Sequence, residues 1–277
     1  MAKTPTYRLK INRAAQHFEE VKRLVAEYES PRPYKVTHRI EGKEKLHVYR
    51  AYPAEEPDPW LAIVIGDLLF DLRSGLDHLR VALAGRKYRN EPGFPIFTED
   101  IWETDSEGKY LERTAGQRQI WEQSTRGMSE RAKVEVDKFQ PFRQPEEQPF
   151  PGREGVLVRR EDTTLAILSR LNNADKHREL VTVVNYVEPR VIRYHFPEGM
   201  QEISISPQAH AVGGHGTVIA RLDREVKVEA IGALRVAMGS REFPKHPGYE
   251  LPVTLEVMIS HIGSVMFDSL EPFVRSS

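Results

Sequence analysis

An arginine and a histidine five positions apart are the residues best suited to chemistry, and both lie in a predicted helix over residues 59–84. These residues are Arg73 and His78. A guanidinium can contact two phosphate oxygens at once, and an imidazole titrates near neutral pH. Together such groups can stabilise negative charge and transfer a proton. On an ideal helix, however, five residues turn the direction of the side chain by about 140°.

The polar side chains of this helix form two stripes. One contains Asp67, Asp71, Ser74 and His78, and the other contains Arg73, Asp77 and Arg80. The simplest interpretation makes the first stripe a solvated face and the second a set of ion pairs, Arg73–Asp77 and Asp77–Arg80. Such pairs stabilise a helix by about 0.2–0.5 kcal/mol each. The stripes therefore require no ligand.

A second dense polar motif, NNADKHRE, occupies residues 172–179 at a predicted helix end. It forms either a site or a structural latch, and the latch is the preferred interpretation. In a latch Asp175 would pair with Arg178 or with the Arg73 stripe, while the cations would satisfy terminal carbonyls. We expect Asp175 or Arg178 to hydrogen-bond to the helix that carries Arg73 and His78.

The hydrophobic pattern predicts the elements that position these residues. A helix begins near Ile11 and ends at Ser30-Pro31, and residues 34–52 form a β-hairpin around Gly42. Asp58 and Pro59 suit the start of the second helix, whose leucines fall within an arc of about 100°. One helix is expected near 114–138, and another begins at Asp162 or Thr163.

Beyond residue 181 the sequence is rich in strands, which Pro and Gly separate, and an amphipathic helix at 255–270 closes the chain. The predicted fold class is α+β. Residues 1–180 form a helical region with the hairpin at 34–52, and residues 181–277 form a β-rich region that ends in the closing helix and packs on the first as one unit. An antiparallel sheet is expected there.

Composition excludes several classes of function. The chain has no cysteine, which removes disulfides, thiolate metal sites and cysteine nucleophiles, and favours a cytoplasmic location. We expect no membrane span, because polar residues interrupt every apolar stretch. Net charge is −1, so no global basic field marks a nucleic-acid coat. The cations that follow the second helix, Arg86, Lys87 and Arg89 with Arg80, are best explained by its dipole.

No cofactor or metal is expected from the histidines. His195, His210 and His215 lie among predicted strands and turns without metal-binding spacing. The glycines at 213–216 suit a hairpin turn better than a phosphate loop, because no helix follows them.

The segment RSGLDH at 73–78 resembles the signature helix of the HEPN superfamily (higher eukaryotes and prokaryotes nucleotide-binding). Many members are metal-independent ribonucleases, in which Arg and His of two protomers face each other across a homodimer interface. The resemblance implies that Arg73 stabilises phosphorane charge and that His78 transfers a proton. Ser74 stands where active members usually carry Asn or Asp.

A wider resemblance covers about residues 10–180. GDLLFDLRSGLDHL at 66–79, FPIF at 94–97 and LNNADKHREL at 171–180 are similar to a widespread family of uncharacterised bacterial and phage proteins. This likeness implies a HEPN-like helical core and no particular activity, and the C-terminal strands lie outside it.

Two functions follow as hypotheses. The first is a HEPN-like protein that binds or cleaves RNA without metal, in defence or toxin biology, with Arg73 and His78 catalytic. Its supporting residues are Ser74, Asp77, Asn172, Asp175, Lys176, His177 and Arg178. The second is a non-catalytic scaffold in which charged residues hold helices together, and the balanced net charge favours it.

Overall fold

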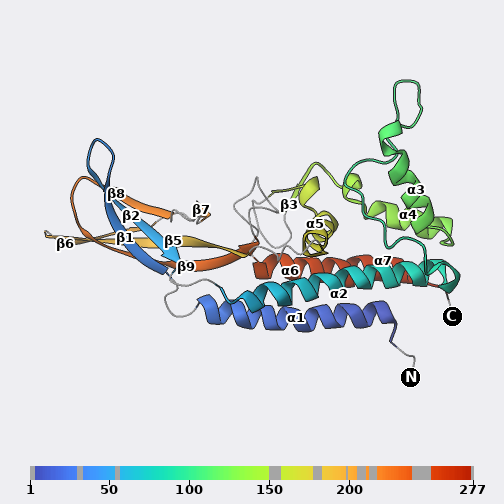
Figure 1. Ribbon diagram of the computed structural model, residues 1–277, viewed down its shortest axis with the longest axis horizontal. Helices are drawn as coiled ribbons and strands as arrows, with labels where there is room; N and C mark the ends of the chain where they lie inside the picture. The colour runs from blue at the N-terminus through green and yellow to red at the C-terminus, as the bar shows by residue number, and fades with distance from the viewer. Residues whose placement is uncertain are drawn as a thin grey trace. The chain divides into compact units, whose positions relative to one another are not determined.

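The computed structural model describes residues 4–29, 34–53, 57–149, 157–176, 183–197, 199–204, 210–211, 217–238 and 251–275. Helices and antiparallel strands both occur, which confirms the α+β class (Figure 1). The chain forms two compact units. The helical unit contains Met1–Phe18, Ile65–Arg178 and Leu255–Ser277, and the sheet unit contains Glu19–Val64 and Glu179–Thr254. The chain therefore crosses between the units several times.

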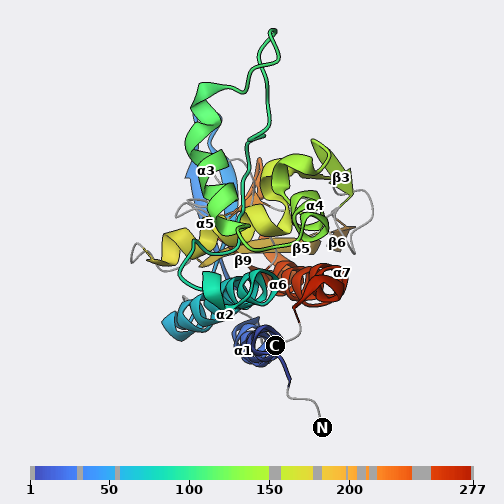
Figure 2. The same cartoon turned by 90° about the vertical axis from the view of Figure 1, so that its right-hand side faces the viewer.

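The helical unit is built around three long helical segments that lie side by side in both views (Figures 1 and 2). They come from α1 (Thr6–Glu29), from α2 (Pro59–Ala84), and from the C-terminal run of α6 (Leu251–Ser260), a π-helical stretch (His261–Met266) and α7 (Phe267–Leu270). Two shorter helices, α3 (Ala115–Ser124) and α4 (Glu130–Lys138), and α5 (Thr164–Lys176) complete the helices.

Helix α2 has the predicted bounds and the predicted buried face. Its N-terminus is capped by Asp58, whose carboxylate accepts a hydrogen bond of 2.8 Å from the backbone N–H of Trp60. The leucines of the face have no exposed surface: Leu68, Leu69, Leu72, Leu76, Leu79 and Leu83. Because the leucine face of α2 is fully buried, the side chains of the surrounding elements pack against it.

Truncating one of these leucines should be costly. Leu72→Ala or Leu76→Ala is expected to lower the free energy of unfolding by about 2–5 kcal/mol, because each removes buried methyl groups and leaves a cavity. Urea unfolding measures the loss. Phe70→Ala is the control, since Phe70 lies on the same helix with 55% of its surface exposed. A Leu76→Ala midpoint equal to that of the wild type would contradict the placement.

The single helix expected near 114–138 is instead a pair, α3 and α4. Gly127 lies between them with a φ of 86°, a conformation that side chains with a Cβ disfavour. A Cβ there would also come within 2.3 Å of the Tyr88 ring. The chain therefore turns at Gly127, where the sequence pattern had suggested continuity.

Two antiparallel sheets occur among the described residues of the sheet unit. The predicted hairpin is confirmed as β1 (Tyr34–Glu41) and β2 (Leu46–Pro53), and β2 also pairs with β8 (Thr217–Leu222). In the second sheet β5 (Val183–Phe196) lies between β6 (Gly199–Ser204) and β7 (His210–Ala211) and also pairs with β9 (Lys227–Met238). Strand β5 runs through Pro189, with a shift of register against β9 between Pro189 and Val191.

The C-terminal helical run is part of the core of the helical unit. By length and composition alone, Leu251–Phe273 is apolar enough to cross a membrane. Its residues Leu255, Met258 and Ile262, however, are buried in the protein. Arg8 of α1 holds this run by donating to Glu271 at 2.7 Å and to the carbonyl of Gly263 at 2.5 Å. These contacts identify a core helix.

Candidate functional site

Arg73 and Asp77 both hydrogen-bond to the backbone of one loop residue, Phe94, and we call this arrangement the Phe94 clamp. Nη2 of Arg73 donates to the carbonyl of Phe94 at 2.8 Å, and Oδ1 of Asp77 accepts from the N–H of Phe94 at 2.8 Å. The predicted Arg73–Asp77 ion pair is also present, with Nη2 and Oδ1 3.2 Å apart. Both polar backbone groups of a buried residue are thereby satisfied.

Gly93 allows this close approach. A Cβ on Gly93 would lie 2.4 Å from Oδ1 of Asp77 and 2.9 Å from Nη2 of Arg73, so any larger residue would displace the loop or the ion pair. The loop that contains the FPIF motif is therefore fixed to α2 at this point, and the motif is placed beside Arg73.

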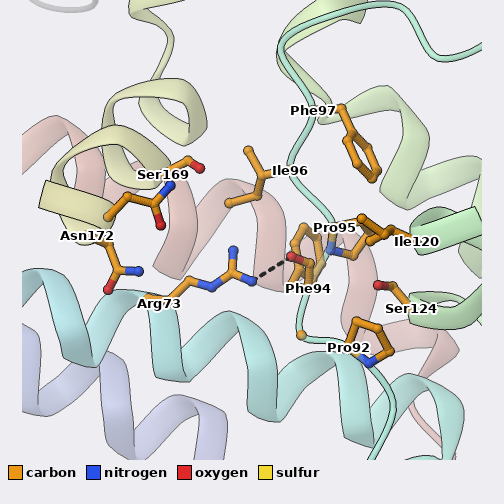
Figure 3. Close-up of a pocket in the computed structure, with 12 residues that line it drawn as sticks. Arg73, Pro92, Phe94, Pro95, Ile96, Phe97, Ile120, Ser124, Ser169 and Asn172 are labelled. Carbon is orange, nitrogen blue, oxygen red and sulfur yellow. Dashed lines mark hydrogen bonds between the residues drawn. The ribbon is translucent and has the colours of Figure 1, made fainter. Parts of the chain in front are cut away.

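A pocket of about 260 Å³ lies beside this clamp. Arg73 of α2, the loop at 92–97, Ile120 and Ser124 of α3, and Ser169, Asn172 and Asn173 of α5 line it (Figure 3). Three helices and one loop thus meet at a single cavity in the helical unit. Its wall combines polar side chains with the apolar side chains of Ile96 and Phe97.

Several polar groups of the pocket have no protein partner within the described residues. Nε and Nη1 of Arg73 make no hydrogen bond there, and neither does the amide of Asn172, which is 4% exposed. The hydroxyl of Ser124 is fully buried and likewise unpaired. Figure 3 shows Asn172 beside Arg73, whereas Phe94 and Pro95 lie between Arg73 and Ser124 in that view. Because an unpaired buried polar group costs about 1–3 kcal/mol, Arg73 and Asn172 indicate a place for a polar ligand, whereas the Ser124 hydroxyl has no accessible surface to offer one.

His78 lies elsewhere on α2. Its side chain is exposed and does not line the pocket, as the angle on an ideal helix predicts. Ser74 is half-buried and is not a lining residue either. Within one chain, therefore, the structure does not bring Arg73 and His78 into a common site.

The motif at 172–179 meets the Arg73 helix through its first two residues. Asn172 and Asn173 share the pocket with Arg73. Asp175 and Lys176 end α5, but their side chains, like the whole of His177 and Arg178, lie outside the described residues. The expected hydrogen bond from Asp175 or Arg178 to α2 stays a prediction.

Arg80 was predicted to pair with Asp77 on the polar stripe, and this was wrong. Only 1% of Arg80 is exposed, and its guanidinium donates to the backbone carbonyls of Tyr88, Gln123 and Ser124. Burial lowers the pKa of this group, because a charged guanidinium loses its hydration. The sequence carries one sign of this placement: four residues turn a helix by about 40°, so Arg80 lies close to the buried Leu76.

Asp71 was also placed on the solvated stripe, and this too was wrong. It is buried, and its carboxylate lies 2.7 Å from Nζ of Lys10 and 3.6 Å from Nε2 of His17, both on α1. The partners come from another helix, so the spacing within α2 gave no sign of them. Asp71 joins α1 to α2.

Within the described residues, no group of three histidine, aspartate or glutamate side chains is arranged to hold a metal ion. His215 and the side chain of His210 lie outside those residues. In the sheet unit, Nε2 of His38 and Nδ1 of His47 lie 2.9 Å apart, a pair that sequence reasoning missed. Cross-strand neighbours of this kind are recognisable only when the register of the hairpin is known.

No protein-family model, curated protein or solved structure matches the chain. The resemblance of residues 73–78 to the HEPN superfamily, and that of residues 10–180 to a family of uncharacterised bacterial and phage proteins, therefore stand on the motifs alone. The function must be argued from the pocket.

Proposed function

We propose that the protein binds RNA in the cytoplasm and that Arg73 holds one phosphate group at the mouth of its pocket. The observation that carries this proposal is the incomplete use of the Arg73 guanidinium. One nitrogen, Nη2, is fixed by Phe94 and Asp77, whereas Nε and Nη1 have no partner within the described residues. A guanidinium held on one side and open on the other is a preorganised contact for phosphate oxygens.

One neighbour of Arg73 suits the same ligand. The Asn172 amide can donate a hydrogen bond to an anionic oxygen. It carries no charge that would repel phosphate, and it is already buried. Binding would therefore satisfy a group for which folding has already removed the hydration.

Cleavage of RNA, in this proposal, requires a second copy of the chain. The exposed His78 of one protomer would approach the Arg73 pocket of its partner, which is the homodimer that the HEPN resemblance implies. The 2′-oxygen would attack the adjacent phosphorus and the P–O5′ bond would break, which leaves a 2′,3′-cyclic phosphate and a 5′-hydroxyl. Arg73 would stabilise the negative charge on the phosphorane oxygens. His78 would take the proton of the 2′-hydroxyl or give one to the leaving 5′-oxygen, with water exchanging the other proton. RNA supplies the nucleophile as its 2′-hydroxyl, so the step needs no metal.

The scaffold remains the second candidate, and the Phe94 clamp favours it. Arg73 and Asp77 satisfy both backbone groups of Phe94, which is a structural task that needs no ligand. On this hypothesis Arg73 matters for the stability of the loop at 92–97 alone. Binding measurements distinguish the two candidates, because only the first requires an affinity for RNA.

Arg73→Lys is expected to weaken binding of a fluorescently labelled single-stranded RNA by about 10- to 100-fold. The lysine keeps the charge but loses the planar array of N–H donors, and a hydrogen bond to a charged group contributes about 1.5–3 kcal/mol. Fluorescence anisotropy at fixed salt measures the dissociation constant. The matched control is Arg113→Lys, because Arg113 forms a surface ion pair with Glu103.

Two results would count against RNA binding at this site. Equal affinities for wild type and Arg73→Lys would place the RNA elsewhere on the protein. No binding to any RNA by the wild type, together with a lower melting temperature of Arg73→Lys, would favour the scaffold.

A further inference from the structure

We infer that a basic cluster at the C-terminal end of α2 binds phosphate groups along a single-stranded segment of RNA. This inference rests on the proposed binding of RNA and names a second surface that the strand contacts. The basic cluster consists of five exposed cations from three parts of the helical unit: Arg86, Lys87, Arg89, Arg126 and Arg275.

Contacts between distant segments bring these cations together. The backbone N–H of Arg275 donates to the carbonyl of Ala82 at 3.2 Å, and the guanidinium of Arg275 donates to the carbonyl of Gly127. Gly127 in turn lies against Tyr88, since a Cβ on this glycine would come within 2.3 Å of the ring. The turn after α3 and the segment after α7 therefore both lie beside the end of α2 (Figure 1).

The turn that follows α2 directs two of the arginines the same way. Arg86–Tyr88 is a 3₁₀ turn, and the N–H of Arg89 donates to the carbonyl of Arg86 at 3.2 Å. Side chains three positions apart eclipse one another in a 3₁₀ turn, so Arg86 and Arg89 project from one side of it. Because like charges at such close spacing repel, an anion bound between them would stabilise the arrangement.

The basic cluster has little balancing negative charge among the described residues. Its one ion pair there joins Nη1 of Arg126 to the carboxylate of Glu91 at 2.8 Å. The side chains of Arg86, Lys87 and Arg89 form no ion pair and no hydrogen bond with any described residue. In a chain whose net charge is −1, five cations beside one carboxylate are a strong local excess. Such an excess attracts polyanions.

The dipole of α2 accounts for only part of this charge. A helix C-terminus carries about half a negative elementary charge, and its effect falls off within the last turn. Two of the last carbonyls of α2 are already satisfied by backbone donors, because Val81 accepts from the N–H of Gly85 and Ala82 accepts from that of Arg275. The exposed cations are therefore available for a partner.

The surroundings of the basic cluster favour RNA over a membrane. A protein that lies on a membrane inserts apolar side chains beside its cations. None of the large exposed hydrophobic side chains among the described residues belongs to 82–91, 126–127 or 274–275. Contacts to the phosphates of RNA need no such side chains, because lysine and arginine neutralise the phosphates and release their counterions.

The basic cluster is also continuous in sequence with the Arg73 pocket. Residues 85–91 lead directly into the loop at 92–97, which lines the pocket and is fixed to α2 by the Phe94 clamp. Arg73 lies about 16 Å along the helix axis from Ala84, the last residue of α2. A strand with one phosphate at Arg73 can therefore place further phosphates on the basic cluster.

Replacing three of these cations together, Arg86→Gln, Lys87→Gln and Arg89→Gln, should weaken both RNA binding and its dependence on salt. For single strands, the logarithm of the association constant falls against the logarithm of the salt concentration with a slope of about −0.7 per neutralised phosphate. Losing three contacts should therefore make the slope shallower by about 2 and reduce the affinity about 10- to 100-fold near 0.1 M salt. Fluorescence anisotropy with the labelled single-stranded RNA at several NaCl concentrations measures both.

The matched control is the triple variant Lys109→Gln, Arg113→Gln and Lys138→Gln. These cations are exposed and lie outside the basic cluster, so the control changes the net charge equally and should keep the slope of the wild type. The cluster variant is expected to fold, because its three side chains are exposed and have no ion pair within the described residues. Equal melting temperatures of the two triple variants and the wild type check this.

The outcomes separate this inference from the proposed function. An unchanged slope in the cluster variant, together with weaker binding by Arg73→Lys, would overturn the inference and leave RNA binding at the pocket intact. A shallower slope in the cluster variant, together with wild-type binding by Arg73→Lys, would support the inference and reject the pocket as a phosphate site. An equal loss in the control variant would assign the effect to net charge and overturn the inference.

Absence of RNA binding by the wild type at low salt would overturn both proposals. Phosphatidylserine vesicles then identify the alternative partner. If the wild type binds these vesicles and the cluster variant does not, the basic cluster contacts an anionic membrane instead of RNA.

Discussion

Arg80→Leu is expected to lower the free energy of unfolding by about 1–3 kcal/mol, because it leaves the buried carbonyl of Ser124 without a donor among the described residues. Each unsatisfied acceptor costs about 1–3 kcal/mol. The carbonyl of Ser124 accepts from Nε of Arg80 at 2.8 Å. The carbonyls of Tyr88 and Gln123 also accept from the guanidinium, but each keeps a backbone donor, the N–H of Glu91 or of Arg126. Leucine fills part of the space and donates nothing. Urea unfolding at constant pH measures the change.

The control for this variant is Arg86→Leu, since Arg86 is exposed just beyond the end of α2. We expect it to change the stability by less than about 0.5 kcal/mol. An Arg80→Leu protein as stable as Arg86→Leu would mean that water or another group replaces the guanidinium at the carbonyls. Arg80→Lys should lie between, because an ammonium can reach fewer acceptors than a guanidinium.

Arg80 also connects stability to the site. Its acceptor Ser124 is at the end of α3, where a backbone carbonyl has no partner within the helix. Ser124 is at the same time a wall of the pocket. Arg80 is thus a positioning residue for Ser124, and its loss should change the pocket even where the protein still folds.

The sequence predicted α2 well because a long leucine face has a helical repeat that no other element shares. It also predicted Arg73 and Asn172 as candidate site residues, each in its own motif, but it missed Ser124. The difference lies in how distinctive each residue type is. Arginine and clustered amides stand out by type, whereas a single serine near the end of a polar helix has no distinctive pattern. Gly93 gave no sign either, because its role depends on the position of Asp77 across the loop.

The errors at Asp71 and Arg80 have a common physical origin. Pattern rules place charged side chains in water, which is correct unless partners arrive from elsewhere in the chain. Lys10 and His17 reach Asp71 from α1, and carbonyls of residues 88, 123 and 124 reach Arg80. Such partners are set by tertiary packing and cannot be read from spacing within one helix.

The sequence also showed no sign that the chain crosses between the two units, because this too depends on contacts between distant segments. The hairpin at 34–53 looks like a local insertion in the sequence, yet β2 pairs with β8, which begins at Thr217. The closing helix follows strands in the chain but lies in the helical unit. Pairing over such distances in sequence depends on matching edges and faces, for which the order of elements gives no information.

The ribonuclease hypothesis makes the largest prediction for activity. Purified protein is expected to cut RNA in the presence of EDTA and to leave DNA intact, because attack by a 2′-hydroxyl needs proton transfer and charge stabilisation but no metal. His78→Ala should lose about 10²–10⁴-fold in rate, the usual contribution of a general acid or base. Its melting temperature should stay close to that of the wild type, since His78 is exposed. Asp67→Ala, exposed on the same stripe, is the matched control.

A mixing experiment tests whether two chains share the site. Arg73→Lys and His78→Ala should each be inactive, but a dimer of one with the other contains one pocket with a native Arg73 that faces a native His78. Denaturing and refolding the two variants together should therefore restore part of the cleavage. If the mixture stays inactive while the wild type is active, the two chains do not share the site, and the proposed dimer mechanism is wrong. Action of both groups from one chain would require side chains that point in different directions on α2 to reach the same phosphate. Equal rates for wild type and His78→Ala would assign cleavage to another site, and no cleavage of any RNA would leave the Arg73 pocket with binding alone.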